Sequence, residues 1–320
     1  MATSSKKLNE IPVVSFDLGN RKNAITDGTK IRSYPSYSDY TGLTQDFQGY
    51  TTEDFKAYKS FHVQIGAQEF NVGDVAGYFA AQPTFAGDKW LKVKEFLFAA
   101  LHSLEIGTTS VIKELRCTVP NDQDHYQRSP FEVLANKTHQ FKVNGIEYTV
   151  HIEKVTILAE GVCAWMRAVN ENLLQYPDYL NGVLDLGGGT AIARLVAPNG
   201  MIYRDYELVL SQGTCALASN IAKGLRKQSV EGLIMDAIAD GSFMVNSTPF
   251  KNLYDMLLPR WVADIRAEIN KAWRPIENQY AQILVVGGST PIFAPYVQDK
   301  PNYVIAPNPQ FYALEGMQNG

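Results

Sequence analysis

The stretch VLDLGGGTAIARLV, residues 183–196, carries the strongest structural signal in the chain. An apolar run ends at Asp185, three consecutive glycines follow, and a second apolar run begins after Thr190. Short apolar runs bounded by turn residues predict buried strands. Three glycines at the end of a buried strand weaken a sheet and leave backbone uncovered, which a plain turn does not require. The stretch therefore predicts a hairpin that is either a phosphate loop or an unusually glycine-rich turn.

The same order of elements occurs near the start of the chain, in SFDLGNRKNAI, residues 15–25. A predicted strand ends there at Asp17, and Asp-Gly at 27–28 supplies a type I′ hairpin signal before a third predicted strand. In the second copy, Asn-Gly at 199–200 takes the corresponding place. The period is far too long for a solenoid repeat, so the pattern indicates duplication of a whole domain.

Both hairpins have the composition that phosphate binding requires. Glycine at a tight turn lets backbone N–H groups approach a polyphosphate closely. An aspartate at the end of the preceding strand, Asp17 or Asp185, can hold the hydration shell of Mg²⁺ beside those phosphates. Arg21 and Lys22 can neutralise phosphate oxygens, and Thr190 adds a hydroxyl. Each hairpin alone can also be an ordinary turn, so the paired occurrence carries the interpretation.

A third glycine turn, Gly287-Gly288-Ser289, follows a predicted strand at 283–286. Glycine leaves room there for the sugar and base of a nucleotide, where a side chain would collide. The turn is also compatible with a simple strand end. Neither Gly-x-Gly-x-x-Gly nor Gly-x-x-x-x-Gly-Lys-Ser/Thr occurs in the chain, so the common dinucleotide-binding and P-loop signatures are not present.

Glu160 is the candidate catalytic residue. It follows an apolar run at 155–158, and Gly161 allows a sharp turn into a predicted helix. A carboxylate at such a junction can orient a water molecule for in-line attack on a γ-phosphate. The same glutamate can instead be a first-turn residue that complements the helix dipole, and the residue pattern leaves both readings open.

Composition restricts the function further. The chain has 320 residues, which is more than one compact core usually holds, so two domains are expected. Its 29 basic and 33 acidic side chains give a formal charge of −4, which argues against direct nucleic-acid binding. The three cysteines lie far apart, without metal-ligand spacing. No apolar run is long enough to span a bilayer, and residues 1–10 are too polar for a signal peptide, so a cytoplasmic protein without membrane contact is expected.

Periodicity predicts the remaining elements. Helices are expected at 89–104, 160–170 and 261–273, with further helix over 214–239. Strands are expected at 111–119 and 148–158, whereas the polar stretch 121–138 is expected to be an irregular surface excursion.

These motifs, in this order, resemble the actin superfamily from about residue 11 to residue 300. SFDLGNRKNAI and VLDLGGGTAIARLV are similar to its two phosphate motifs, VTILAEGVCAW at 155–165 to its junction motif, and ILVVGGSTPIFAPYV at 283–297 to its adenosine motif. Within the superfamily the chain looks most like the ParM/StbA group of bacterial actin-like plasmid-segregation ATPases, because of Glu160 and the tail PNPQFYALEGM at 307–317. It departs from that group in Asn20-Arg21-Lys22, where relatives commonly have small residues, and in Ser289, which replaces a frequent third glycine.

The resemblance implies an α/β actin-like fold of two ribonuclease-H-like domains around a nucleotide cleft. Domain I would span 1–175 and domain II 176–300, with 301–320 packing back on domain I. The implied cofactors are ATP, with GTP as the alternative, and Mg²⁺ held through water by Asp17 and Asp185, while Glu160 polarises the attacking water. The implied nucleotide-binding residues are Asp17, Leu18, Gly19, Asn20, Arg21, Lys22, Asp185, Gly187, Gly188, Gly189, Thr190, Gly213, Thr214, Gly287, Gly288 and Ser289.

The resemblance also implies an ATPase that polymerises with itself and segregates plasmids. Its filaments would bind an adaptor protein on a plasmid centromere, so that DNA is contacted only indirectly. Two alternatives share the phosphate hairpins. One is a sugar or acetate kinase of the same superfamily. Such a kinase needs a base that faces a substrate hydroxyl, whereas Glu160 is expected to activate a water molecule. The other is a non-polymerising, nucleotide-gated scaffold, although the C-terminal segment is Pro- and Asn-rich rather than an amphipathic membrane anchor.

Overall fold

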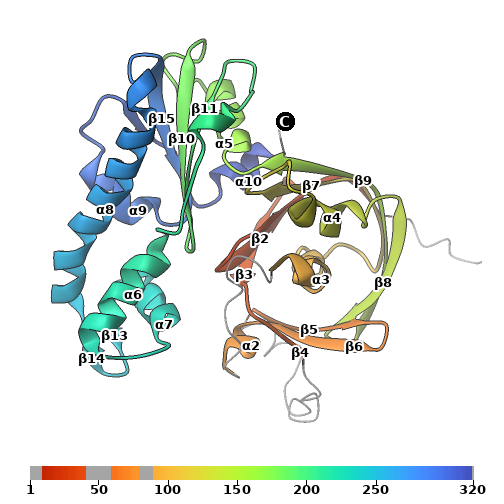
Figure 1. The fold of residues 1–320 in the computed structure, drawn as a ribbon. Helices are drawn as coiled ribbons and strands as arrows, with labels where there is room; N and C mark the ends of the chain where they lie inside the picture. Colours follow the sequence, from red (N-terminus) through yellow and green to blue (C-terminus); the bar gives the residue numbers. More distant parts are fainter. Residues whose placement is uncertain (1–8, 41–58, 79–88, 319–320) are drawn as a thin grey trace, which may run out of the picture. The chain divides into compact units, whose positions relative to one another are not determined.

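The computed structural model describes residues 9–40, 59–78 and 89–318, which form two compact α/β units (Figure 1). The chain passes from the first unit to the second between Ala159 and Glu160, and Met317 and Gln318 belong to the first unit again. The expected boundary at residue 175 is therefore too late, because helix α5 (Val162–Asn170) packs on the sheet of the second unit. Of the segment 301–320, which was expected to pack on domain I, residues 301–316 group with the second unit, and Met317 and Gln318 group with the first.

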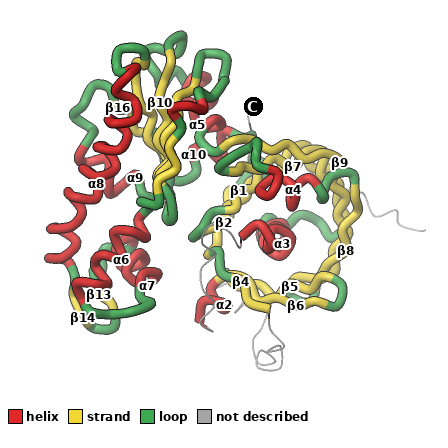
Figure 2. The backbone as a smooth tube through the Cα atoms, in the orientation of Figure 1, coloured by secondary structure: helices red, strands yellow, loops and turns green. Residues whose placement is uncertain are grey.

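The first unit is a nine-stranded sheet that curls around helix α3 (Val93–Ser103) (Figure 2). The strand order is β3-β2-β1-β7-β9-β8-β5-β6-β4, in which β7 pairs in parallel with β1 and β9 and the other pairs are antiparallel. The strands are β1 (Asn9–Leu18), β2 (Lys22–Thr26), β3 (Ile31–Pro35), β4 (Ser38–Tyr40), β5 (Ser60–Ile65), β6 (Gln68–Gly73), β7 (Thr109–Val119), β8 (Lys137–Val143) and β9 (Ile146–Ala159).

Helix α3 is buried along most of its length, and Lys94 is its exposed residue. Phe96, Leu97 and Leu101 are fully enclosed, and Phe98 stacks on Phe141 of β8 with ring centroids 4.0 Å apart. A helix with apolar side chains on most of its surface needs such an enclosure, and the curled sheet provides it. The unit also contains α2 (Asp74–Tyr78) and the 3-10 helix η2 (Lys89–Lys92), which leads directly into α3.

The stretch 121–138, expected to be irregular, contains helix α4 (His125–Glu132). The Asp124 side chain accepts a hydrogen bond from the N–H of Tyr126 at 2.9 Å and so caps the start of this helix. The expectation was wrong because the cap, rather than apolar periodicity, marks the helix.

The second unit is a five-stranded sheet with helices on both faces. The strand order is β12-β11-β10-β15-β16, in which β10 pairs antiparallel with β11 and parallel with β15. The strands are β10 (Leu180–Leu186), β11 (Ala191–Val196), β12 (Leu208–Leu210), β15 (Tyr280–Val286) and β16 (Tyr303–Ile305), with a separate hairpin of β13 (Met244–Val245) and β14 (Thr248–Pro249).

Successive residues of β10 face opposite sides of this sheet, as a strand requires. Val183 lies in the apolar cluster beneath α5 and α10 (Tyr312–Gly316), whereas Leu184 and Leu186 lie in the cluster beneath the other helices. Those helices are α6 (Thr214–Leu225), α7 (Glu231–Ala239), α8 (Lys251–Trp273) and α9 (Thr290–Phe293), and 3-10 turns complete the unit at η3 (Arg204–Tyr206), η4 (Arg274–Ile276) and η5 (Ala294–Tyr296).

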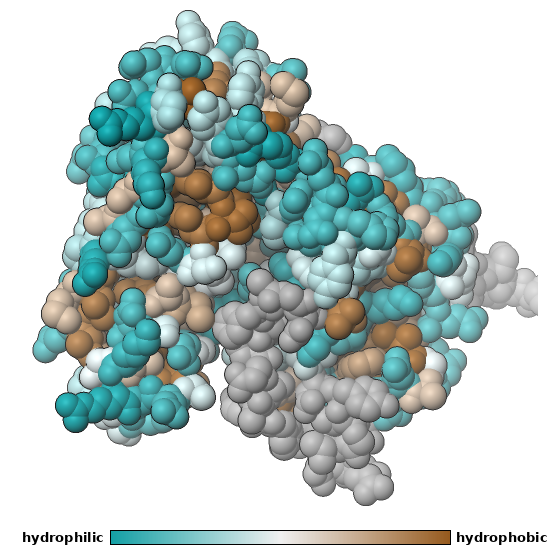
Figure 3. Space-filling view, viewed as in Figure 1, coloured by the Kyte–Doolittle hydropathy of each residue, from teal (hydrophilic) through white to brown (hydrophobic). Residues whose placement is uncertain are grey.

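One face of the surface is drawn in Figure 3. On the face seen in Figure 3, hydrophilic side chains predominate and apolar ones form separate patches. Within the described ranges, no helix combines the length and apolarity that crossing a membrane requires.

Candidate functional site

The glycine hairpin between β10 and β11 has its carbonyl groups bound by the start of α6. The main-chain N–H groups of residues 213–215 donate to the main-chain oxygens of residues 187–189 at 2.8–3.3 Å. The N–H groups of Gly188 and Gly189, by contrast, donate to no described residue. Amides left unpaired by such a turn form a binding place for an anion.

Glycine is needed where the hairpin meets α6. A Cβ on Gly213 would lie 2.5 Å from the carbonyl oxygen of Gly188, a distance that no real side chain tolerates. The main chains at 187–189 and at the separately predicted Gly213-Thr214 therefore lie in direct contact. The space between them is too small for a side chain on Gly213.

The turn after β15 lies against the same hairpin. Gly287 has φ +95°, and a Cβ there would lie 2.5 Å from Asp185 Oδ1 and from the Leu186 oxygen. The N–H of Ser289 donates to the Leu186 oxygen at 2.9 Å, and its hydroxyl bonds to the Gly187 oxygen at 3.0 Å and to the Thr214 hydroxyl. Three segments predicted separately, at 185–190, 213–214 and 287–289, thus meet in the second unit.

The first hairpin, between β1 and β2, has its carbonyl groups bound by side chains and by one amide. The Ser36 hydroxyl donates to the Gly19 oxygen at 2.6 Å, and the Ser36 N–H donates to the Arg21 oxygen at 2.8 Å. Lys89 Nζ donates to the Leu18 oxygen at 2.9 Å. Asn20 Oδ1 is buried without a hydrogen-bond partner among the described residues, so it can accept a hydrogen bond from a ligand or from water.

Asp17 sits at the end of β1 beside this hairpin. The Thr118 hydroxyl donates to Asp17 Oδ1 at 3.0 Å. Burial raises the pKa of Asp17, and the Lys89 ammonium and the Thr118 hydrogen bond lower this pKa in part. Lys89 is itself 3% exposed and lies 4.4 Å above the Trp90 ring. A buried carboxylate and a buried ammonium therefore lie at the first hairpin.

Sequence reasoning missed three residues that contact the first hairpin or Asp17: Lys89, Ser36 and Thr118. Lys89 lies 71 positions after Leu18, at the start of a predicted helix, and nothing in its surroundings indicates phosphate chemistry. Thr118 had a usable signal, because it is the second-last residue of the strand predicted at 111–119. In parallel strands the carboxyl ends meet at one edge, and β1 and β7 pair as Phe16 with Cys117.

Glu160 lies at the predicted strand-to-helix junction, after β9 and before α5. Gly161 has φ +86°, and a Cβ there would lie 3.2 Å from Val183 Cγ1. Arg194 Nη1 donates to the main-chain oxygen of Glu160. The structure groups Glu160 with Asp185 in the second unit, whereas Asp17 and residues 18–22 belong to the first.

The described residues contain no cluster of three or more His, Cys, Asp or Glu side chains that could hold a metal directly.

Comparison with known proteins identifies the fold. Residues 15–162 match the family described as Actin like proteins N terminal domain. No curated protein sequence matches the chain. Among solved structures, apo psk41 ParM matches with a TM-score of 0.70 and 17% identity, covering 96% of this chain and 95% of that one.

Two further structures match over similar lengths. The archaeal actin homologue Ta0583 in complex with ADP has a TM-score of 0.72 and 16% identity, covering 96% of this chain and 98% of that one. A 15-stranded ParM filament from Clostridium botulinum has a TM-score of 0.73 and 16% identity, covering 98% and 99%. Identities this low establish the fold alone, and the fold is the actin-like α/β fold.

Proposed function

We propose that this chain, which has the actin-like fold, is a filament-forming ATPase that segregates plasmid DNA through an adaptor protein. The observation that carries the proposal is the meeting of residues 187–189, 213–215 and 287–289 beside Asp185. The backbone segments lie this close together, and the N–H groups of Gly188 and Gly189 have no acceptor among the described residues. This arrangement is better explained by polyphosphate binding than by a plain turn. The filament part is supported by the fold shared with a ParM filament, and the nucleotide part by the fold shared with an ADP complex.

The residues present fit a nucleotide with Mg²⁺, which when bound would neutralise phosphate charge. Asp17 and Asp185 would hold water ligands of the ion. The amides of Gly188 and Gly189, the Thr190 hydroxyl and residues 18–22 would bind phosphates, beside Gly213 and Thr214. Gly287, Gly288 and Ser289 would line the sugar and base. Glu160 would accept a hydrogen bond from the attacking water and orient it.

Light scattering of the purified chain tests the filament. We expect scattering to rise with ATP and to fall after hydrolysis, to persist with a non-hydrolysable analogue and to stay low with ADP. The same measurements with GTP show whether the protein prefers ATP or GTP. If no nucleotide produces a polymer at any ionic strength, the filament proposal is wrong.

Phosphate release tests the catalytic residue. Glu160→Ala should retain nucleotide binding and slow release by roughly 100-fold or more, because a positioned carboxylate typically contributes this much. The matched control is Glu153→Ala, an exposed glutamate on the preceding strand that pairs with Lys113. Unchanged release in Glu160→Ala would remove Glu160 from the active site.

Calorimetry tests the metal-linked aspartate. Asp185→Ala should weaken Mg²⁺–ATP binding by about 10-fold or more while affinity for ATP with EDTA changes less, because the carboxylate acts through the ion. Equal losses with and without Mg²⁺ would contradict this role. Transfer of phosphate to sugars or acetate, instead of to water, would favour the kinase alternative.

A further inference from the structure

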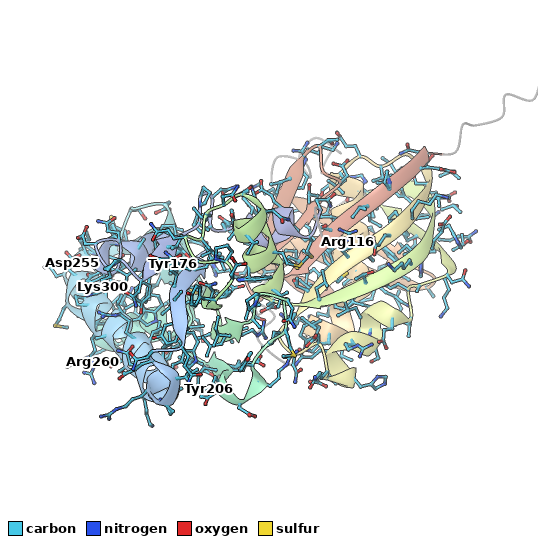
Figure 4. The ribbon with its side chains drawn as sticks, turned by 90° about the horizontal axis from the view of Figure 1, so that it is seen from above. Arg116, Tyr176, Tyr206, Asp255, Arg260 and Lys300 are labelled. Atoms are coloured by element: carbon cyan, nitrogen blue, oxygen red, sulfur yellow. The ribbon has the colours of Figure 1, made fainter. Side chains whose placement is uncertain are left out.

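Arg194 on β11 is a buried charge that none of the roles above uses. Its side chain is 1% exposed. Nε and Nη2 donate to Glu207 Oε1 at 2.9 and 2.7 Å, and Glu207 Oε2 accepts from Arg204 Nη1 at 3.0 Å. Glu207 follows Tyr206, which is labelled in Figure 4. The two bonds to one carboxylate oxygen fix the plane of the Arg194 guanidinium.

A further bond of this guanidinium reaches the junction after β9. Nη1 donates to the main-chain oxygen of Glu160. The next residue, Gly161, packs on Val183, and Val183 is the cross-strand partner of Arg194. One cross-strand pair therefore holds both residues of the junction, Gly161 by contact and Glu160 by a charge-assisted hydrogen bond.

The same pair lies on the face of the sheet that carries Asp185. Asp185 pairs with Ile192, and Val183 pairs with Arg194, two residues away along each strand. Residues two apart on a strand point to the same face. The main chain of Glu160 is thus tied to the face of β10 and β11 on which Asp185 ends the strand.

We propose that Arg194 is a positioning residue, which fixes the main chain of Glu160 so that its carboxylate is presented for hydrolysis. This inference rests on the proposed role of Glu160. A buried guanidinium needs partners wherever it lies, so a purely structural role is the competing explanation. The two explanations differ in one respect: a positioning residue loses its effect when Glu160 has no carboxylate.

The test is a double-mutant cycle in the full chain, with ATP and Mg²⁺. Phosphate-release rate and ATP affinity are measured for Arg194→Lys, Glu160→Ala and the double variant. Lysine keeps the charge but cannot bind Glu207 and the Glu160 oxygen together with the geometry of a planar guanidinium. We expect Arg194→Lys to lower the release rate by roughly 10- to 100-fold, as small displacements of catalytic groups do, with ATP affinity within about 2-fold. In the Glu160→Ala background the same substitution should lower the rate by less than about 2-fold.

The matched control is Arg116→Lys. Arg116, labelled in Figure 4, also binds a carboxylate, that of Glu114, and a main-chain oxygen, that of Met317. Its substitution should leave the release rate unchanged. If Arg194→Lys does not fold, as judged by circular dichroism, Glu207→Gln replaces it, since this change loosens the guanidinium without removing it. A smaller fall in rate, again lost without Glu160, is then expected.

Three results would overturn the inference: no fall in rate, an equal fall in both backgrounds, or a fall in affinity in place of rate. If Glu160→Ala itself does not slow release, the proposed catalytic role of Glu160 fails first, and the positioning role fails with it. If Glu160→Ala slows phosphate release and Arg194→Lys does not, the catalytic role of Glu160 stands and only the positioning role of Arg194 is rejected.

Discussion

The two glycine hairpins solve the same problem with different groups. At each, donors from elsewhere in the unit bind the carbonyl groups of the turn. At the first hairpin two of the three donors are side chains, the Ser36 hydroxyl and the Lys89 ammonium. At the second the main donors are main-chain amides of residues 213–215. A side-chain donor can be removed by substitution and a main-chain donor cannot. We therefore expect the first hairpin to be disturbed most by loss of a donor group, and the second by a side chain that is too large for the close backbone contact.

Shape should give the largest effect. Gly213→Ala places a methyl group 2.5 Å from main-chain atoms of Gly188 and Gly189, which cannot move aside as a side chain would. We expect the free energy of unfolding of the second unit to fall by about 3 kcal/mol and ATP affinity by about 100-fold. Thermal unfolding and calorimetry measure the two losses.

The control for this substitution is Gly107→Ala, where the added Cβ would meet nothing closer than 3.7 Å. It should change stability by less than about 0.5 kcal/mol. Equal effects of the two substitutions would contradict the close approach of α6 to the hairpin.

Charge at the first hairpin should give the next effect. Lys89→Met removes the ammonium beside Asp17 and should lower Mg²⁺–ATP affinity by about 10-fold, whereas Lys89→Arg should lower it less. The pKa of Asp17 is already raised by burial, and Lys89 lowers it in part. Without Lys89 this pKa rises further, so the carboxylate is lost at a higher pH on acidification.

The acid limb of ATP affinity, measured against pH, should therefore move to higher pH in Lys89→Met. In the free protein the raised pKa has the opposite consequence for stability. Because the pKa of Asp17 is higher in the folded than in the unfolded protein, the free energy of unfolding falls as the pH rises from 3.8 through the folded-state pKa. An acid limb that does not move would show that Lys89 does not act on Asp17.

Single hydroxyl groups should give the smallest effects and the sharpest contrast. Ser36→Ala removes the bond to the Gly19 oxygen and a second bond to Asn23, at 3.1 Å. Since one hydrogen bond contributes about 1 kcal/mol, ATP affinity should fall about 5-fold. Ser289→Ala should cost about 2-fold, because the Gly187 oxygen keeps the amide of Thr214. A larger loss for Ser289→Ala would reverse the comparison.

The features that the sequence predicts correctly are those formed by residues close together in the chain. The glycine turns and their flanking strands follow from composition alone, and β11 has the predicted bounds of 191–196. The turn at 27–28 shows the limit of such signals. Its Asp-Gly pair predicts a two-residue type I′ hairpin, but Thr26 pairs with Ile31, which leaves a loop of four residues. The side chain of Asp27 bonds to the N–H groups of Thr29 and Lys30 and stabilises that longer loop.

The polar partners of the site could not be predicted, because each depends on pairing between distant segments. Lys89 reaches the first hairpin through the path of η2, and Thr118 through the parallel pairing of β1 with β7. Arg194 stands in an apolar strand pattern, where its charge gives no hint that Glu207 and Glu160 lie within reach. Residues of this kind become visible when strand register is known.

The placement of Met317 and Gln318 has a consequence for biosynthesis. Arg116 bonds to the Met317 oxygen, and the Gln318 amide bonds to the Ser15 hydroxyl and the Thr26 oxygen, all within the first unit. A ribosome makes the whole of the second unit before it makes these two residues. Domains usually complete their folding in the order of synthesis, but here the unit that is begun first receives its last contacts after the other is finished.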